Sequence, residues 1–275
     1  MEKEILFSCQ EDGLKIHHTL TPEPSIENFA FQSHAHNMYE IFLFLGGDGE
    51  FVVEGNVIPL IRGTLIFTLC GQTHKLLLKS NNEPYERIAL MFSDKFFPKG
   101  AEELLENSAN GGCVATLEEK EINWFLESIE ILKNSNAKHT INILASSFIN
   151  LSIYKIMNGS KASNFYDETE DDLVKQIIRF IDRNLGEDLS LDIIEKELYR
   201  DKAYLGRRFK SVMGCSIWDY IIRKRIYCAR EQLFLTQNIA DAFSLSGFGD
   251  YSAFYRNYKK YIGASPSEDL KQFLE

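Results

Sequence analysis

The sequence lacks the features of secreted, membrane-spanning and disulfide-stabilised proteins. No apolar run approaches the ~20 residues that a membrane span requires, and the opening Met-Glu-Lys-Glu does not have the pattern of a secretory signal. The 5 cysteines are an odd, scattered set without a CxxC pair, which indicates neither a cysteine zinc site nor disulfides. We therefore expect a cytoplasmic protein that does not contact a membrane.

Signatures of common enzyme classes are also missing. The sequence shows no Ser/His/Asp nucleophile arrangement and no phosphate-binding loop, so a hydrolase or a kinase has no support. The chain has 275 residues, which is long enough for two domains that each bury a core of their own.

Negative charge is concentrated in the first part of the chain. Residues 1–171 contain 13 Lys and Arg against 25 Asp and Glu, whereas residues 172–275 contain 17 against 15. The overall net charge of −10 therefore does not exclude a nucleic-acid partner. We expect the mildly basic C-terminal part to contact phosphate groups and the acidic part to avoid them.

Residues 5–95 have the pattern of many short strands. Apolar or alternating runs occupy 41–45, 50–53, 64–68 and 87–92. Glycine-containing segments at 46–49 and 54–56 lie where hairpin turns belong. This part is therefore predicted to form an antiparallel barrel or sandwich.

Within this β-rich part, His34, His36 and Glu40 alternate and are predicted to share one face of a strand. His74 follows after a turn. The HxHx3E spacing with a later histidine resembles the cupin metal motif, although Ile61 stands where cupins often have proline. Imidazole and carboxylate groups on one face are typical metal ligands.

Three interpretations of these residues remain open. His34, His36, Glu40 and His74 hold a divalent metal ion, line a pocket for a small-molecule effector, or are polar barrel-mouth residues satisfied by hydrogen bonds. We favour the effector pocket, which would also include Phe42 and Phe44 on the same strand face.

The pattern becomes helical at residues 117–157. Thr116 and Glu119 fit a capping box, and Asn134-Ser-Asn136 separates two amphipathic helices. One interpretation is that the two helices only cap the open side of the barrel. In families of this shape such a pair usually also forms the dimer contact, so a homodimer is expected. The small polar residues that follow predict an interdomain linker at 159–170.

The C-terminal part is predicted to be entirely helical. Ser190 is a good N-cap, and a long helix is expected from Ile217 to Leu235. Its predicted buried side consists of Trp218, Ile221, Ile222, Ile226, Ala229 and Leu233. Asn238 or a neighbour is expected to start a further unit that leads to Gly247-Phe248.

The segment 247–266 carries a specific motif. Gly247 and Phe248 are followed at fixed spacing by Ser252, Phe254, Arg256, Tyr258, Lys259, Gly263, Ser265 and Pro266. This pattern resembles the second helix-turn-helix of the AraC/XylS transcription regulators, and 201–210 is similar to the family's first recognition helix.

The resemblance implies a two-domain α+β protein. A cupin-like antiparallel β-barrel (1–115) would be followed by two accessory, dimerising helices (116–158), the linker, and an all-α domain of two helix-turn-helix units joined by a long helix (171–275). Its implied partners are DNA, an effector and, for an activator, RNA polymerase. The implied DNA contacts are Lys202, Ala203, Gly206, Arg207, Lys210, Tyr251, Ser252, Tyr255, Arg256, Lys259 and Lys260.

Two positions depart from the family pattern, which usually has a small residue there. Phe243 is compensated by the small neighbour Ala242. Glu195 falls on an apolar stripe and needs a partner, for which we predict an ion pair with Arg208. Two alternatives to an effector-responsive DNA-binding regulator therefore stay open: a metal-dependent cupin enzyme with a helical accessory domain, and a regulator-derived protein with weakened DNA binding.

Overall fold

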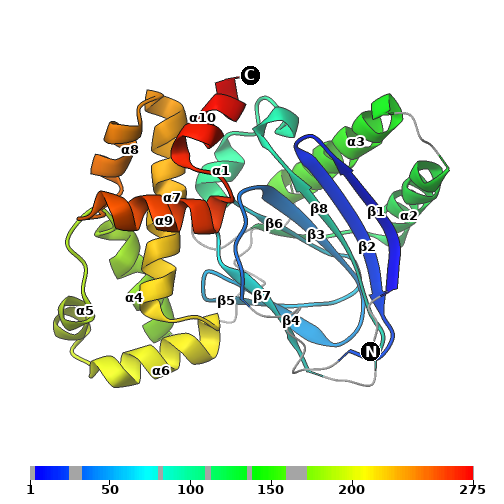
Figure 1. Ribbon diagram of the computed structural model, residues 1–275. Helices are drawn as coiled ribbons and strands as arrows, with labels where there is room; N and C mark the ends of the chain where they lie inside the picture. The colour runs from blue at the N-terminus through cyan, green and yellow to red at the C-terminus, as the bar shows by residue number, and fades with distance from the viewer. Residues whose placement is uncertain are drawn as a thin grey trace. The chain divides into compact units, whose positions relative to one another are not determined.

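Figure 1 shows the computed structural model of the chain, in which residues 4–24, 33–79, 83–108, 113–134, 138–158 and 172–274 are described. The chain divides into two compact units. The first comprises Met1–Gln32, Met38–Leu69 and Lys75–Glu168, and the second comprises Ser33–Asn37, Cys70–His74 and Thr169–Glu275. The predicted linker at 159–170 lies outside the described residues.

The first unit is built on antiparallel sheets. A six-stranded sheet has the order β1-β2-β8-β3-β6-β9, and a three-stranded sheet has the order β5-β4-β7. The strands are β1 (Glu4–Glu11), β2 (Leu14–Thr21), β3 (Tyr39–Gly46), β4 (Gly49–Val53), β5 (Asn56–Pro59), β6 (Thr64–Thr68), β7 (His74–Leu78), β8 (Tyr85–Phe92) and β9 (Cys113–Thr116). The predicted strands and the β4–β5 hairpin are confirmed. Glu54 and Gly55 in that hairpin both have positive φ, 47° and 77°, as its tight turn requires.

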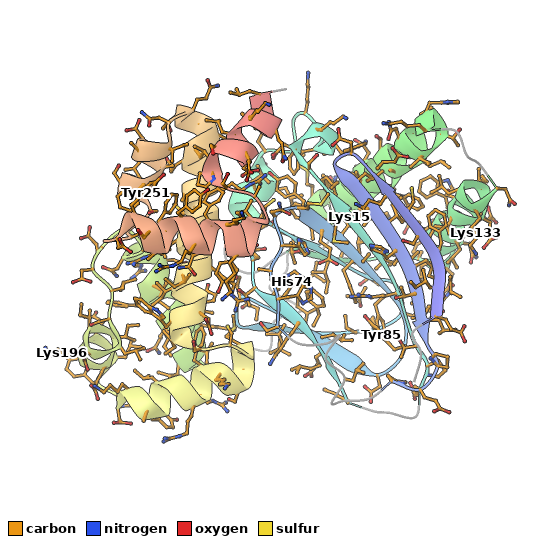
Figure 2. All side chains as sticks on the ribbon, viewed as in Figure 1. Lys15, His74, Tyr85, Lys133, Lys196 and Tyr251 are labelled. Carbon is orange, nitrogen blue, oxygen red and sulfur yellow. The ribbon has the colours of Figure 1, made fainter. Side chains whose placement is uncertain are left out.

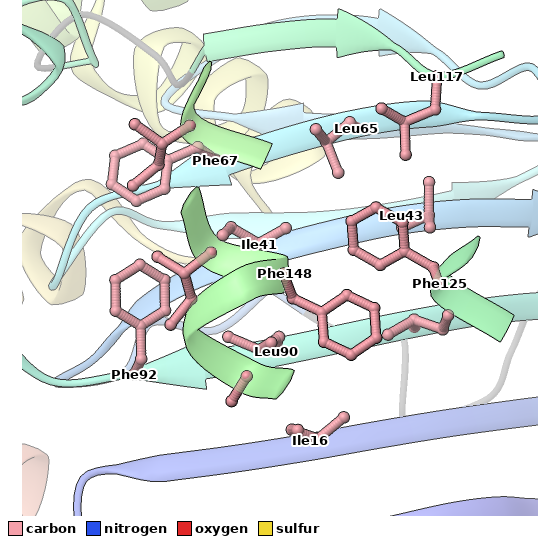
Figure 3. Packing of buried hydrophobic residues seen from close by; sticks show 14 of the residues in the cluster. Ile16, Ile41, Leu43, Leu65, Phe67, Leu90, Phe92, Leu117, Phe125 and Phe148 are labelled. Atoms are coloured by element: carbon pink, nitrogen blue, oxygen red, sulfur yellow. The ribbon is translucent and has the colours of Figure 1, made fainter. Parts of the chain in front are cut away.

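The six-stranded sheet is a middle layer. One face packs against α2 (Glu119–Lys133) and α3 (Lys138–Asn158), where Phe125 and Phe148 cover Ile41 and Leu43 (Figure 3). Side chains from its other face join the three-stranded sheet in a second core that contains Phe42. Both faces are buried, which explains why β3 is apolar at consecutive positions and does not alternate.

The helical pair follows the prediction with one correction. The capping box of α2 is formed by Glu118 and Glu121, not by Thr116 and Glu119. Thr116 is the last residue of β9, where it is paired with Thr64, so it is not available as an N-cap. The break between the helices is confirmed: α2 ends with Asn134 as its C-cap, and residues 135–137 lie outside the described residues.

The helices of the second unit surround two apolar cores. They are α4 (Asp172–Arg183), α5 (Leu191–Leu198), α6 (Lys202–Met213), α7 (Ile217–Thr236), α8 (Ile239–Leu245), α9 (Tyr251–Ile262) and α10 (Pro266–Leu274). The long helix α7 contributes Tyr220 and Ile221 to the first core and Ile226 and Leu233 to the second. The two helix-turn-helix heads, α5–α6 and α8–α9, therefore share one rigid element.

Trp218 is a wrong prediction within α7. It was expected on the buried side, but 46% of it is exposed. The buried stripe passes through Ile217 and Tyr220 at the start of the helix, and Trp218 lies about 100° around the axis from Ile217. Among the described helices, none is both long and apolar enough to cross a membrane.

Candidate functional site

The first head presents α6 through a well-capped turn. Ser190 caps α5 by accepting from the Ile193 N–H, and Asp201 caps α6 by accepting from the Tyr204 N–H at 2.9 Å. Leu205 and Phe209 on the inner face of α6 are buried in the first core. This packing fixes which face of α6 points outward.

The outward face of α6 carries the predicted DNA contacts. Lys202, Ala203, Arg207 and Lys210 are exposed, and Gly206 is partly exposed. The Lys202 ammonium lies 2.6 Å from an Asp192 carboxylate oxygen, and this hydrogen-bonded ion pair raises the pKa of Lys202. Lys202 is thus charged but already engaged with its own protein.

Glu195 has a partner that the sequence analysis did not identify. Its Oε1 accepts a hydrogen bond from the backbone N–H of Lys202 at 3.2 Å. Lys202 is the first residue of α6, whose N–H has no acceptor within the helix, and a carboxylate is favourable at a helix N-terminus. Glu195 therefore helps to cap α6, and its pairing with Arg208 stays a prediction.

The second head presents α9 in the same way. Asp250 accepts from the N–H groups of Ser252 and Ala253 at 3.2 and 2.7 Å. Phe254 and Tyr258 are buried in the second core. The opposite face bears the exposed side chains of Tyr251, Ser252, Tyr255, Arg256, Lys259 and Lys260.

Aromatic rings shape the start of α9. Ala242 is fully buried, whereas the neighbouring Phe243 is half-buried and packs edge-on against Tyr251 at 5.3 Å between ring centroids. Phe243 also lies 5.5 Å from Phe254. The large residue that departs from the family pattern therefore supports Tyr251, a predicted DNA contact (labelled in Figure 2).

Arg225 joins the two heads and was missed by the sequence analysis. Its buried guanidinium donates to the carbonyl oxygens of Leu185 and Glu187 at 3.0 and 2.6 Å, in the turn between α4 and α5. Gly247, in the turn between α8 and α9, packs against the same α4–α5 turn. A β-carbon added to Gly247 would lie 2.5 Å from the Leu185 carbonyl oxygen. Its φ of 74° also favours glycine. The i, i+4 spacing of Arg225 from Ile221 and Ala229 was the available signal for its burial.

A buried ion pair anchors α10 in the second head. Asp269 accepts from Arg230 Nε at 2.8 Å and Nη2 at 3.2 Å, and it also accepts from the Tyr258 hydroxyl at 2.8 Å. Burial and the Asp269 carboxylate raise the pKa of Tyr258. This network ties α7, α9 and α10 together, and no sequence motif pointed to it.

Three of the predicted N-terminal ligands come together. The imidazole donor atoms of His34, His36 and His74 all lie within 4.8 Å of one another. The ring centroids of His34 and His36 lie 4.4 and 5.1 Å from that of His74. His74 is buried, His36 is partly buried and His34 is exposed.

The local structure that brings them together differs from the prediction. His34 and His36 do not lie on the strand that contains Glu40, because β3 begins only at Tyr39, after a bend. His34 instead forms an isolated bridge with His74, with backbone N–O distances of 3.0 and 2.9 Å. Strand periodicity was therefore the wrong reason for grouping the histidines, and Glu40 is not a member of this group of donors.

Glu40 is instead associated with charged and polar groups of the sheet. Burial raises the pKa of Tyr85 to about 12; the nearby Arg87 opposes this shift and the Glu40 carboxylate adds to it. The Arg87 guanidinium lies 5.8 Å from the centre of the Phe42 ring. Phe42 and Phe44 are buried between the sheets, so ionisable groups lie beside an aromatic core there (Tyr85 and His74 are labelled in Figure 2).

A model described as a helix-turn-helix domain matches residues 195–272, which include both heads. The HTH-type transcriptional activator RhaS of Yersinia pestis bv. Antiqua (strain Angola) is 25% identical over 257 residues, 89% of this chain and 90% of that protein.

Similar solved structures include ToxT from Vibrio cholerae O395. It is 17% identical, with a TM-score of 0.40, over 95% of this chain and 98% of that one. A Listeria innocua protein covers 37% of this chain and 98% of its own at 29% identity, with a TM-score of 0.36. The matched helix-turn-helix domain and the near-full-length similarity to named transcriptional activators support a transcription regulator of the AraC/XylS type.

Proposed function

We propose that the protein binds DNA by placing α6 and α9 in two successive major-groove segments. The observation that carries this proposal is the pair of capped helices whose inner faces are buried and whose outer faces expose basic and polar side chains. Helix-turn-helix heads read adjacent groove segments when they lie about one helical turn of DNA apart. The shared helix α7 and the contacts of Arg225 support such a fixed spacing.

Within this interface, arginines and lysines have different roles. Arg207 and Arg256 are the base-reading candidates, because guanidinium groups bind the two major-groove acceptors of guanine. Lys202, Lys210, Lys259 and Lys260 contact phosphates, which position the protein without reading sequence. Tyr251, Ser252 and Tyr255 add contacts beside Arg256, whereas Ala203 and Gly206 offer little to a base.

Footprinting tests the two-head arrangement. Genome-wide mapping of bound sites provides the operator, and hydroxyl-radical footprinting of that duplex should show two protected segments about 10 base pairs apart. A single protected segment would contradict the use of both heads. If no salt-sensitive binding to any mapped site is found, the alternative of a regulator with weakened DNA binding replaces this proposal.

We propose that the signal is a small molecule bound in the β-rich unit, at a site that includes Glu40, Phe42 and Phe44. The buried Glu40 near Tyr85 and Arg87 supports it, because ionisable groups beside an aromatic core can orient a polar ligand. A thermal-shift screen should identify a ligand whose stabilisation is lost in Glu40→Gln and kept in Glu127→Gln, an exposed control on α2. Equal stabilisation of both variants would place the ligand elsewhere.

We also propose that α3 forms a homodimer contact. Its outer side exposes apolar residues, among them Ile143 with 62% of the residue accessible, together with Tyr154 and Met157. In α3 these positions share a stripe, since they are 11 and 14 residues apart. Ile143→Glu should convert a dimer to a monomer in light scattering, whereas Ile5→Glu on β1, where isoleucine is 64% exposed, should not.

Two further assignments rest on the family. Because the curated relatives are named transcriptional activators, we propose contact with RNA polymerase at the promoter, in the cytoplasm. The enzyme alternative would account only for the histidine group, and the family is one of transcription regulators.

A further inference from the structure

We propose that His34, His36 and His74 bind one first-row divalent transition metal ion, for which Zn²⁺ is the reference. The three donor nitrogens lie within 4.8 Å of one another. Zn²⁺ binds imidazole nitrogen at ~2.0–2.1 Å, so the donors of one ion lie about 3–4 Å apart. Small side-chain rotations are enough to close this difference.

The backbone already holds the two segments that carry the donors. His34 and His74 exchange two backbone hydrogen bonds, and the Gly71 N–H donates to the His36 carbonyl oxygen at 2.9 Å. The ligands therefore come from segments far apart in sequence that are joined by main-chain pairing. Such support keeps donors near a binding geometry before any ion arrives.

The protonation of His74 suits coordination. Its Nδ1 lies 2.9 Å from the carbonyl oxygen of Gln72, which can only accept, so Nδ1 carries the proton. Nε2 is then the nitrogen with the lone pair. Histidine ligands of metals usually donate their other ring N–H to a carbonyl or carboxylate in this way, which fixes tautomer and ring orientation.

The donor set also predicts selectivity. Imidazole suits Zn²⁺, Co²⁺, Ni²⁺ and Cu²⁺, whereas Mg²⁺ and Ca²⁺ require oxygen ligands. Three protein nitrogens leave a coordination position for water or another small ligand. The competing interpretation is that the rings only pack edge-to-face, as their interplanar angles of 65° and 71° allow.

The test is metal titration of the full chain after removal of metals with a chelator. Co²⁺ should bind at one ion per chain with a visible absorption band, and Zn²⁺ should displace it while Mg²⁺ does not. His36→Ala and His34→Ala should each weaken Co²⁺ binding at least ~10-fold. His139→Ala on α3 is the matched control and should bind like the unmodified protein.

A separate control verifies that the variants are folded. His34 is exposed, so its substitution leaves the core intact, and circular dichroism verifies this. Absence of one-to-one Co²⁺ binding, or equal affinities for the His34, His36 and His139 variants, would show that the rings only pack. The readout does not involve DNA, so it is independent of whether the proposed DNA contacts are correct.

Discussion

The recognition helices α6 and α9 are each 12 residues long, begin after an aspartate N-cap and end at a glycine with positive φ. The two helices differ in the side chains that they expose to solvent. α6 exposes Ala203 and leaves Gly206 without a side chain, whereas α9 exposes Tyr251 and Tyr255 at 47% and 39%. The two helices therefore have similar backbones but different outer surfaces, and we expect α9 to read bases more than α6.

The ion pairs of the two heads differ as well. In the first head, Lys202 and Asp192 pair at the surface. Beside the second head, Arg230 of α7 and Asp269 of α10 form a largely buried pair, and Asp269 also accepts a hydrogen bond from Tyr258 of α9. A surface pair contributes little to stability, but removal of one partner of a buried pair leaves an uncompensated charge. We therefore expect the stability around the second head to depend more on its ion pair than the stability of the first head does.

The largest expected effect is on stability. Asp269→Ala should lower the free energy of unfolding by about 3–5 kcal/mol, because it leaves the Arg230 guanidinium and the Tyr258 hydroxyl without this acceptor. Urea denaturation measures this change. The control Asp192→Ala removes an exposed carboxylate and should leave the transition unchanged. Equal changes in the free energy of unfolding for the two substitutions would contradict the proposed difference between the two ion pairs.

Two glycine substitutions, one in each head, should change the stability of the protein in opposite directions. Gly247→Ala forces a β-carbon against the Leu185 oxygen and should destabilise by about 1–3 kcal/mol. Gly206→Ala places a β-carbon in open space within a helix and should stabilise by about 0.5–1 kcal/mol. Thermal melts of both variants measure these shifts. A neutral Gly247→Ala would show that the two turns do not pack closely.

The smallest effect concerns the salt dependence of DNA binding. Lys259→Ala should weaken binding to operator and scrambled duplexes alike, and should reduce the slope of log K against log salt by about 1. Lys202→Ala should change the slope less, because Asp192 already neutralises part of its charge. Titrations at several salt concentrations measure both. A larger change for Lys202 would mean that its pair with Asp192 opens on DNA.

Features set by local chemistry could be predicted from the sequence. The Glu54-Gly55 hairpin and the N-cap Ser190 were found because each depends on a few neighbouring residues, and the N-cap Asn238 lies where the second unit was expected to start. The two-domain fold and both recognition helices followed from periodicity and from the motif around Gly247 and Arg256.

Features that depend on distant contacts could not be predicted. His34 pairs with His74 across about forty residues, so the assumed strand through His36 and Glu40 was wrong. The spacing of Arg225 from Ile221 and Ala229 indicates that it is buried, but no local pattern reveals its partners, the carbonyl groups of the Leu185 turn. Trp218 shows that helix spacing alone does not decide between neighbouring apolar residues at a helix start.

We expect α9 to discriminate between DNA sequences more than α6 does. The most direct test compares Arg256→Ala with Arg207→Ala, using the ratio of affinities for the mapped operator and a scrambled duplex at two salt concentrations. Arg256→Ala should reduce the difference in binding free energy between the two duplexes by about 1–3 kcal/mol, and Arg207→Ala should reduce this difference less. An unchanged ratio for Arg256→Ala, or a larger loss for Arg207→Ala, would contradict the claim.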